Sequence, residues 1–274
     1  MNQSTLSRRQ LLFGGGAAAL VAAMDALGVE PRWLRVTEHE VAVAKLPKSL
    51  DGYRIAQITD AHLRDIGVIE EKLIREIENR NVGLVVLTGD MIDNPMSLNV
   101  LDEFCHNLQA TRRTVLATLG NCEHDADIDI SALRDKYRAH GIRLLVNESV
   151  SIDSAIGVAA TDDSTNGQVS LRKTMLGHTE AAVNLFLTHS PALLDDLPAT
   201  LGRFDLALAG HTHGGQGRIG SFAPMLPPGS GRFISGWYKV PIGRAYVSCG
   251  TGMHVIPARF ACRPELPIFS LRQA

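Results

Sequence analysis

The sequence has no dense run of lysine and arginine, and its formal net charge is only −2. A broad nucleic-acid-binding surface needs a strongly basic face, so we expect no nucleic-acid scaffold among its partners. The cysteines contain no Cys-x-x-Cys pair, which argues against a zinc knuckle or a redox motif. No internal repeat and no linker divides the chain into independent domains. These absences leave an ordinary globular protein with ample core to bury.

A long apolar run is also missing. The stretch that ends near Leu27 is short for a transmembrane helix and rich in glycine and alanine. It directly follows Arg8 and Arg9, and that order resembles a twin-arginine export signal, which a receptor reads on proteins that are already folded. We therefore interpret residues 1–30 as a signal or an N-terminal anchor. The predicted partner is the twin-arginine export machinery, and the predicted location is periplasmic, extracytoplasmic or membrane-anchored, with membrane association through this segment.

Apolar strands alternate with amphipathic helices through the first half of the remaining chain. Leu84-Val85-Val86-Leu87 is a continuous apolar run, as expected of a strand buried on both faces. Further strands are predicted at 34–43, 54–59, 114–118, 183–188 and 205–209, helices at 68–80, 98–108 and 130–140, and a helical stretch near Ala192. Residues 217–231, rich in glycine and proline, are predicted to form a long loop, and the tail from Phe233 to Leu271 several short strands. We expect an α/β domain over residues 31–274, with two packed sheets and helices outside.

Polar side chains follow five of the predicted strands directly. They are Asp60 and His62, Asp90, Asn121, His189, and His211 with His213. Ligands gather at the carboxyl ends of strands in open α/β sheets, so these residues could converge on one spot. Gly89, Gly120 and Gly210 stand before three of them and permit tight turns and close backbone approach.

The residue types indicate metal chemistry. Carboxylate, imidazole and amide oxygen ligands suit Mn, Fe or Zn. Two ions about ~3.5–4 Å apart need a bridging carboxylate, and can then clamp a phosphoryl group and activate a water. Each motif alone is weak evidence of a metal site, because an Asp-x-x-Asp can be simple helix capping and a lone histidine at a strand end is more often structural. The ordered set is what predicts a site with two divalent ions.

In this order, from about Arg54 to Gln216, the motifs resemble those of the calcineurin-like metallophosphoesterases. The resemblance implies a four-layer αββα sandwich of two mixed sheets flanked by helices. It also implies that Asp60, His62, Asp90 and His213 hold one metal and that Asp90 bridges to a second, completed by Asn121, His189 and His211. A hydroxide between the metals would then attack phosphorus. The implied activity is metal-dependent hydrolysis of phosphate mono- or diesters.

The stretch Gly210-His-Thr-His-Gly-Gly-Gln216 narrows the resemblance. It is similar to a bacterial branch that is often exported or membrane-associated and includes enzymes compared with UDP-diacylglucosamine hydrolases. The tail residues Gly250, Pro257, Arg259, Pro264 and Glu265 also resemble that branch. A nucleotide-linked lipid or another cell-envelope substrate is the corresponding expectation.

One position departs from the family pattern. The family usually has Gly-Asn-His, where the histidine stabilises the transition state or protonates the leaving group, and here that histidine is replaced by Cys122. A neutral thiol is a poor substitute for an imidazolium. We name His124, two residues on, as the candidate catalytic acid beside Asp90; otherwise the metals act alone. Cys122 itself could be a small buried packing residue. His254, just after the Gly-rich segment 248–252, could also approach the site.

Three classes of function follow. The leading one is an active dinuclear phosphoesterase. The second is a metal-bound protein that binds phosphate or lipid headgroups with little turnover, because Cys122 replaces the usual histidine. The third, a metal-stabilised structural domain, is disfavoured because a structural site rarely needs a bridging carboxylate and an open position.

Overall fold

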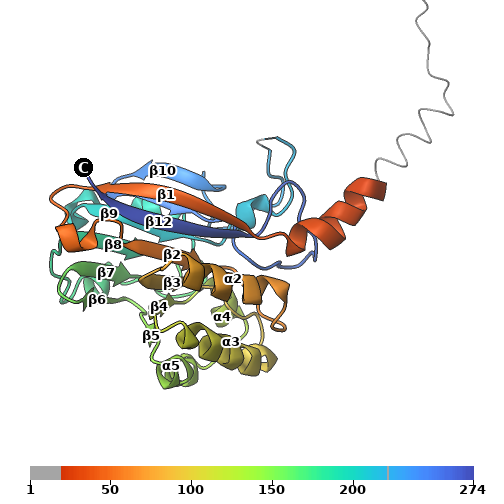
Figure 1. Ribbon diagram of the computed structural model, residues 1–274, viewed down its shortest axis with the longest axis horizontal. Helices are drawn as coiled ribbons and strands as arrows, with labels where there is room; N and C mark the ends of the chain where they lie inside the picture. Colours follow the sequence, from red (N-terminus) through yellow and green to blue (C-terminus); the bar gives the residue numbers. More distant parts are fainter. Residues whose placement is uncertain (1–19, 221) are drawn as a thin grey trace, which may run out of the picture.

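Two six-stranded sheets form the centre of the molecule in the computed structural model, which describes residues 20–220 and 222–274 (Figure 1). The first sheet has the order β1 (Arg35–Val43), β12 (Glu265–Gln273), β2 (Arg54–Ile58), β3 (Leu84–Thr88), β4 (Thr114–Thr118) and β5 (Arg143–Leu144). The second has the order β10 (Gly236–Val240), β11 (Gly243–Val247), β9 (Phe204–Ala209), β8 (Val183–Leu187), β7 (Ile156–Ala160) and β6 (Glu148–Ile152). Both sheets are mixed, because β12–β2, β10–β11 and β6–β7 pair antiparallel and the other neighbours parallel.

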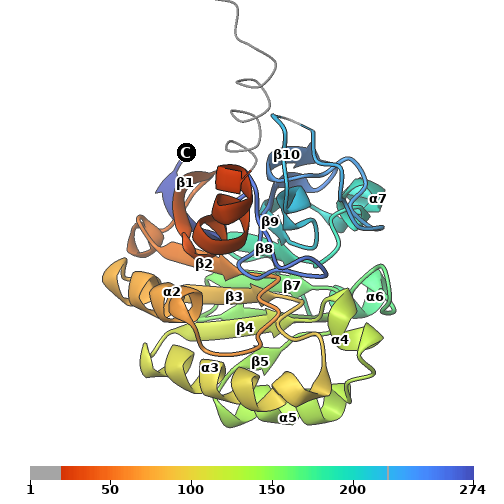
Figure 2. The same cartoon turned by 90° about the vertical axis from the view of Figure 1, so that its right-hand side faces the viewer.

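Helices cover the outer faces of the sheets. Figure 2 shows α2 (Val68–Asn79), α3 (Leu98–Ala110) and α5 (Ile130–Ala139) together on one side, and α6 (Leu171–Thr174) and α7 (Leu193–Asp196) on the other. A short helix, α4 (Asn121–Asp125), follows β4. Short 3-10 turns span Lys48–Leu50, Pro95–Ser97, Ala199–Leu201 and His213–Gly215.

Three apolar clusters fill the three interfaces between the layers. The central one joins the sheets, with Leu84 and Val86 of β3 facing Leu185 of β8. Val85 and Leu87 point the other way, into the cluster under α2, α3 and α5, and Phe186 points into the outer cluster of the second sheet. Side chains alternate between faces along a strand, so a strand between two layers must be apolar at every position. The αββα sandwich predicted from the sequence is confirmed.

Most elements lie where the sequence predicts them, and the differences are informative. The continuous run in β3 is fully buried, as expected. The helix predicted at 130–140 ends at Ala139, before Gly141, whose φ is +69°. Three strands between Arg143 and Ala160 were not predicted. Residues 217–231 form no strand or helix where they are described, in agreement with the predicted loop.

The N-terminal segment continues into the folded body. Arg8 and Arg9, on which the predicted export signal depends, lie outside the described residues. Two short helical turns, Asp25–Val29 and Glu30–Arg32, lead into β1. The carboxylate of Glu30 is buried and accepts the backbone N–H of Ala261 at 2.8 Å. Among residues 20–220 and 222–274, no helix combines the length and the apolar character needed to span a bilayer.

Candidate metal centre

The predicted ligands sit where the central strands of both sheets end. Asp60, Asp90 and Asn121 follow β2, β3 and β4, which are parallel neighbours in the first sheet. His189 and His211 follow β8 and β9, which are parallel neighbours in the second. Hydrogen bonds link strand ends of the first sheet to strand ends of the second. For example, Gln57 Nε2 of β2 donates to the carbonyl of Ala209 of β9 at 3.0 Å. Ligands from both sheets therefore meet at one end of the sandwich.

Two buried groups of possible ligands result. One contains Asp60, His62 and His213, and the other Asp90, His189 and His211. Within each group the ligand atoms all lie within 4.8 Å of one another. The residues in each group are those that the family resemblance assigns to the same metal ion. The metal-binding roles themselves stay predictions.

Asp90 lies between the two groups. Its Oδ2 atom is 3.3 Å from His189 Nε2 and 3.8 Å from His62 Nε2, so one carboxylate oxygen faces an imidazole of each group. The other oxygen, Oδ1, accepts the backbone N–H of Cys122 at 2.8 Å. Asn121 joins the second group, with its Oδ1 atom 3.2 Å from His189 Nε2. This placement suits the bridging role predicted for Asp90.

Backbone carbonyls orient two of the imidazoles. His189 Nδ1 lies 2.8 Å from the carbonyl of Thr88, and His211 Nε2 lies 2.6 Å from that of Pro228. A carbonyl can only accept, so each of these nitrogens carries a hydrogen, and the other nitrogen of each ring faces the site. Outer partners of this kind are typical of metal-binding histidines.

Burial controls the charges at the centre. It raises the pKa of Asp60 to about 6, although His189 and nearby donors act in the opposite direction. Burial also lowers the pKa of His62 to about 4 and that of His211 to about 4. For His189 burial again opposes the charge, but the attraction of Asp90 outweighs it and raises the pKa well above its usual range. His62 and His211 are thus held in the neutral form in which histidine binds metals, whereas His189 would release a proton when a metal binds.

The donor set fits a pair of divalent cations. His62 Nε2 and His213 Nε2 face each other at 3.1 Å, and Asp60 Oδ1 lies 3.5 Å from the latter. The Nδ1 atoms of both rings are buried and find no hydrogen-bond partner among the described residues. The buried Nε2 atoms and the Asp60 oxygen that converge here are what a cation site requires. Mixed carboxylate, imidazole and amide donors suit Mn, Fe or Zn.

The ligand loops have unusual backbone conformations. Five candidate ligands have positive φ: Asp60 (52°), His62 (44°), Asp90 (52°), His211 (71°) and His213 (49°). Non-glycine residues rarely adopt this region, and such strain concentrates at functional sites. Gly210 permits the close approach beneath them, since a Cβ there would overlap Thr59 and the Asp60 carboxylate. The close packing expected at this glycine is present.

Glu123 is a structural residue of the site that the sequence analysis passed over. Its buried carboxylate accepts the backbone N–H groups of Asp90 at 3.0 Å, Met91 at 2.7 Å and Gly120 at 2.9 Å. It thereby ties the loop after β3 to the loop after β4. A glutamate three residues after Gly120, at the start of a helix, is the sequence signal for this arrangement.

His124 points away from both ligand groups. Its Nε2 atom is 2.7 Å from Asp162 Oδ1, and the hydrogen bond to Asp162 raises the pKa of His124. No group of possible metal ligands among the described residues includes it. Its role as the catalytic acid stays a prediction.

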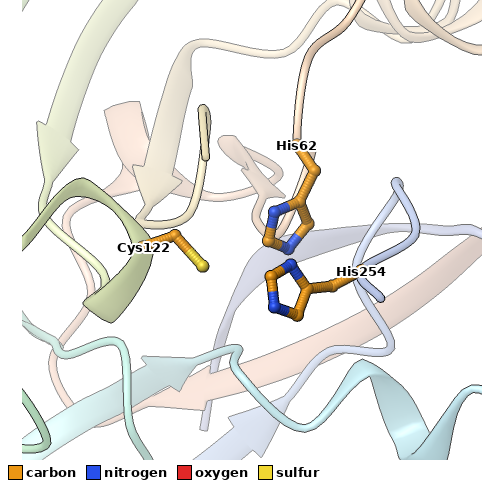
Figure 3. Close-up of side chains that lie close together, drawn as sticks. All are labelled: His62, Cys122 and His254. Atoms are coloured by element: carbon orange, nitrogen blue, oxygen red, sulfur yellow. The ribbon is translucent and has the colours of Figure 1, made fainter. Parts of the chain in front are cut away.

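Cys122 and His254 both lie close to His62, with ligand atoms within 4.8 Å of one another. Cys122 is buried, and burial together with Asp90 raises the pKa of its thiol far above the usual value, so the thiol is neutral. The His254 ring stacks on His62 with centroids 4.7 Å apart. Figure 3 shows the Cys122 sulfur facing the two stacked imidazoles. The approach of His254, raised from the sequence, is thus present in the structure.

Arginines near the site bind the protein itself. Arg218 donates to the carbonyl of Gly214 at 2.6 Å, and Arg232 forms a two-point contact with Asp195. Arg259 is fully buried and donates to the carbonyls of Cys249 and Cys262, both at 3.0 Å. These guanidinium groups shape the loops around the site.

Comparison with known proteins identifies the family of the chain. Residues 53–215 match the family model described as calcineurin-like phosphoesterase. The metallophosphoesterase YkuE of Bacillus subtilis is 30% identical over 97% of this chain and 98% of its own length. A transmembrane protein with a metallophosphoesterase domain from Danio rerio is 27% identical over 88% of this chain and 58% of its own. Among solved structures, a dimetal phosphatase from Danio rerio is similar with a TM-score of 0.48 and 12% identity, covering 81% of this chain and 93% of that one.

Proposed function

Because the chain belongs to the calcineurin-like phosphoesterase family and is a phosphoesterase, we propose that it hydrolyses phosphate mono- or diesters at a centre of two divalent ions. Asp60, His62 and His213 would hold one ion, Asn121, His189 and His211 the other, and Asp90 both. Bound ions of this kind supply Lewis acids for phosphoryl oxygens and lower the pKa of a water. The position of Asp90 Oδ2 between His62 and His189 carries the proposal, since a bridging carboxylate is not needed for a single structural ion.

The protein contributes orientation. Carbonyl partners fix the rings of His189 and His211, and Glu123 fixes the backbone on either side of Asp90. A rigid set of ligands avoids reorganisation during the reaction, which is the main way a protein assists such chemistry.

Metal analysis tests this proposal. We expect purified protein to contain two divalent ions per chain, to lose turnover of bis-p-nitrophenyl phosphate after chelation, and to regain it with Mn, Fe or Zn. His211→Ala should lower the metal content, while His140→Ala should not, because His140 contacts only the half-exposed Asp102 among the described ion pairs. Full turnover by metal-free protein would overturn the mechanism. Two bound ions and phosphate binding with no turnover of any ester would instead support the headgroup-binding alternative.

The substrate is proposed to carry an apolar group, as a lipid of the cell envelope does. A groove next to His213 and His254 has apolar walls from two segments, formed by Met225, Leu226, Pro227, Val255 and Ile256. Apolar walls beside a phosphate-binding centre favour an ester whose organic part is an alkyl or acyl chain. This groove supports the expectation of a lipid-linked substrate.

We also propose export by the twin-arginine route, with membrane association through the N-terminal segment. The support is the order of Arg8-Arg9 and the following apolar stretch. The described part of that segment presents large apolar side chains to solvent, namely Leu20, Val21, Met24 and Leu27. Exposed apolar side chains that lie together are typical of a surface that contacts a membrane or a receptor.

A further inference from the structure

The loop after β4 places Cys122 beside the first ligand group. Where the family pattern has an imidazole, this chain has Cys122, whose side chain is shorter and whose thiol is a weak hydrogen-bond donor. The Sγ atom lies within 4.8 Å of ligand atoms of both His62 and His254. Cys122 therefore lies beside a second imidazole, that of His254, which comes from a different part of the chain.

His254 has an unmet hydrogen-bonding capacity there. Its Nδ1 atom is buried and has no partner among the described residues. A buried polar atom without a partner is costly, so such an atom at a functional site indicates that a ligand completes it. In Figure 3 the His254 ring lies directly beneath the His62 ring, and the Cys122 sulfur lies to one side and faces both. An oxygen of a bound phosphoryl group would lie within reach of both the metal ligands and this ring.

Gln216 fixes the backbone that carries His254. Its Oε1 atom accepts the backbone N–H of His254 at 3.1 Å, and its Nε2 atom donates to the carbonyl of Ile256 at 2.6 Å. Arg259 donates to the carbonyl of Gly252, which lies two residues before His254, at 3.0 Å. Gln216 itself is buried and has a φ of 53°. These hydrogen bonds fix the backbone from which the His254 imidazole extends.

We propose that His254 donates a hydrogen bond to a phosphoryl oxygen of the substrate, in place of the imidazole that Cys122 does not supply, and that Gln216 is its positioning residue. This inference rests on the proposed function, because it assigns a contact within the same site. A preorganised donor aimed at phosphoryl oxygen stabilises the charge that develops there during transfer. A neutral imidazole has one N–H group and suffices for this contact.

Variants at His254 test the assignment. His254→Ala should keep both metal ions, lower kcat by about 10²-fold as does the loss of one such donor elsewhere, and weaken the binding of inorganic phosphate to metal-loaded protein. His254→Gln keeps a donor and should retain part of both properties. Cys122→His in the His254→Ala background should restore turnover. Gln216→Ala should lower kcat and phosphate affinity by less than His254→Ala does. The matched control is His140→Ala, at a partly buried histidine outside the groups of possible metal ligands among the described residues.

Two results would overturn the inference. One is unchanged phosphate affinity and kcat in His254→Ala. The other is loss of a metal ion in that variant, which would make His254 a ligand rather than a donor to the substrate. If wild-type protein binds phosphate through His254 yet hydrolyses no ester, the contact is upheld and the proposed hydrolysis fails.

Discussion

At the scale of single residues, the two oxygens of Asp90 have different tasks. Oδ1 accepts the backbone N–H of Cys122, and Oδ2 faces His62 and His189. An asparagine could keep the first contact with its carbonyl oxygen. Its amide NH₂ would then point at the two imidazoles, where a cation is expected. Replacing this one atom should therefore affect both ions while the loop stays folded.

We expect Asp90→Asn to lower metal content at both positions and to reduce turnover at least about 100-fold, since even outer partners of metal ligands account for 10–100-fold. Metal analysis and kinetics of the purified variant measure the two effects. Asp102→Asn, the same change on the outer surface, is the control. Wild-type turnover by Asp90→Asn with two bound ions would show that the carboxylate does not bridge.

The sequence alone reveals ligand candidates at strand ends more readily than it reveals residues that act through contacts with distant loops. Asp60, Asp90 and His189 are apparent because each stands two residues after the end of a short, largely apolar strand. Glu123 and His254 act through contacts with loops distant in sequence: Glu123 binds the backbone of Asp90, 33 residues away, and His254 is held by Gln216, 38 residues away. Spacing along the chain carries little information about such contacts.

At the scale of elements, strands that are evident from their own sequence were predicted, and strands that depend on pairing with distant segments were missed. β3 is a run of large apolar residues, and its burial on both faces leaves no other interpretation. β7 has the sequence Ile-Gly-Val-Ala-Ala and is equally buried, but glycine and alanine have low strand propensity. Its place in the second sheet comes from pairing with β6 and β8. Tertiary context, which the sequence pattern does not contain, decides this element.

Two loops form the walls of the apolar groove, and they predict a preference in substrates. Alkyl phosphate esters with longer chains should have lower KM, by up to about 4-fold for each methylene that becomes buried. Ile256→Ser should reduce this gain. Ile219→Ser is the matched control, because Ile219 is 75% exposed and does not line the groove. Equal KM values for short and long chains would contradict an apolar substrate.

At the scale of the whole molecule, the N-terminal segment is proposed to direct export, and the folded body is proposed to carry the metal centre. Changing Arg8 and Arg9 together to lysine should leave the protein in the cytoplasm, since the export receptor reads that pair. The same double change at Arg112 and Arg113, an arginine pair between α3 and β4, should not affect export. Cell fractionation with immunoblotting measures both. Unchanged export of the first variant would indicate another route.

The pairing of β1 with β12 constrains the order in which the chain can fold. β1 lies at the edge of the first sheet and joins it through β12, in a parallel register that runs from Arg35↔Glu265 to Val43↔Gln273. β12, which follows the other strands in sequence, thus connects the first strand to the rest. A nascent chain can assemble β2, β3 and β4 early in synthesis, but β1 can join this sheet only once β12 has been made. Synthesis of β12, rather than of the metal-ligand motifs, therefore determines when this sheet is completed.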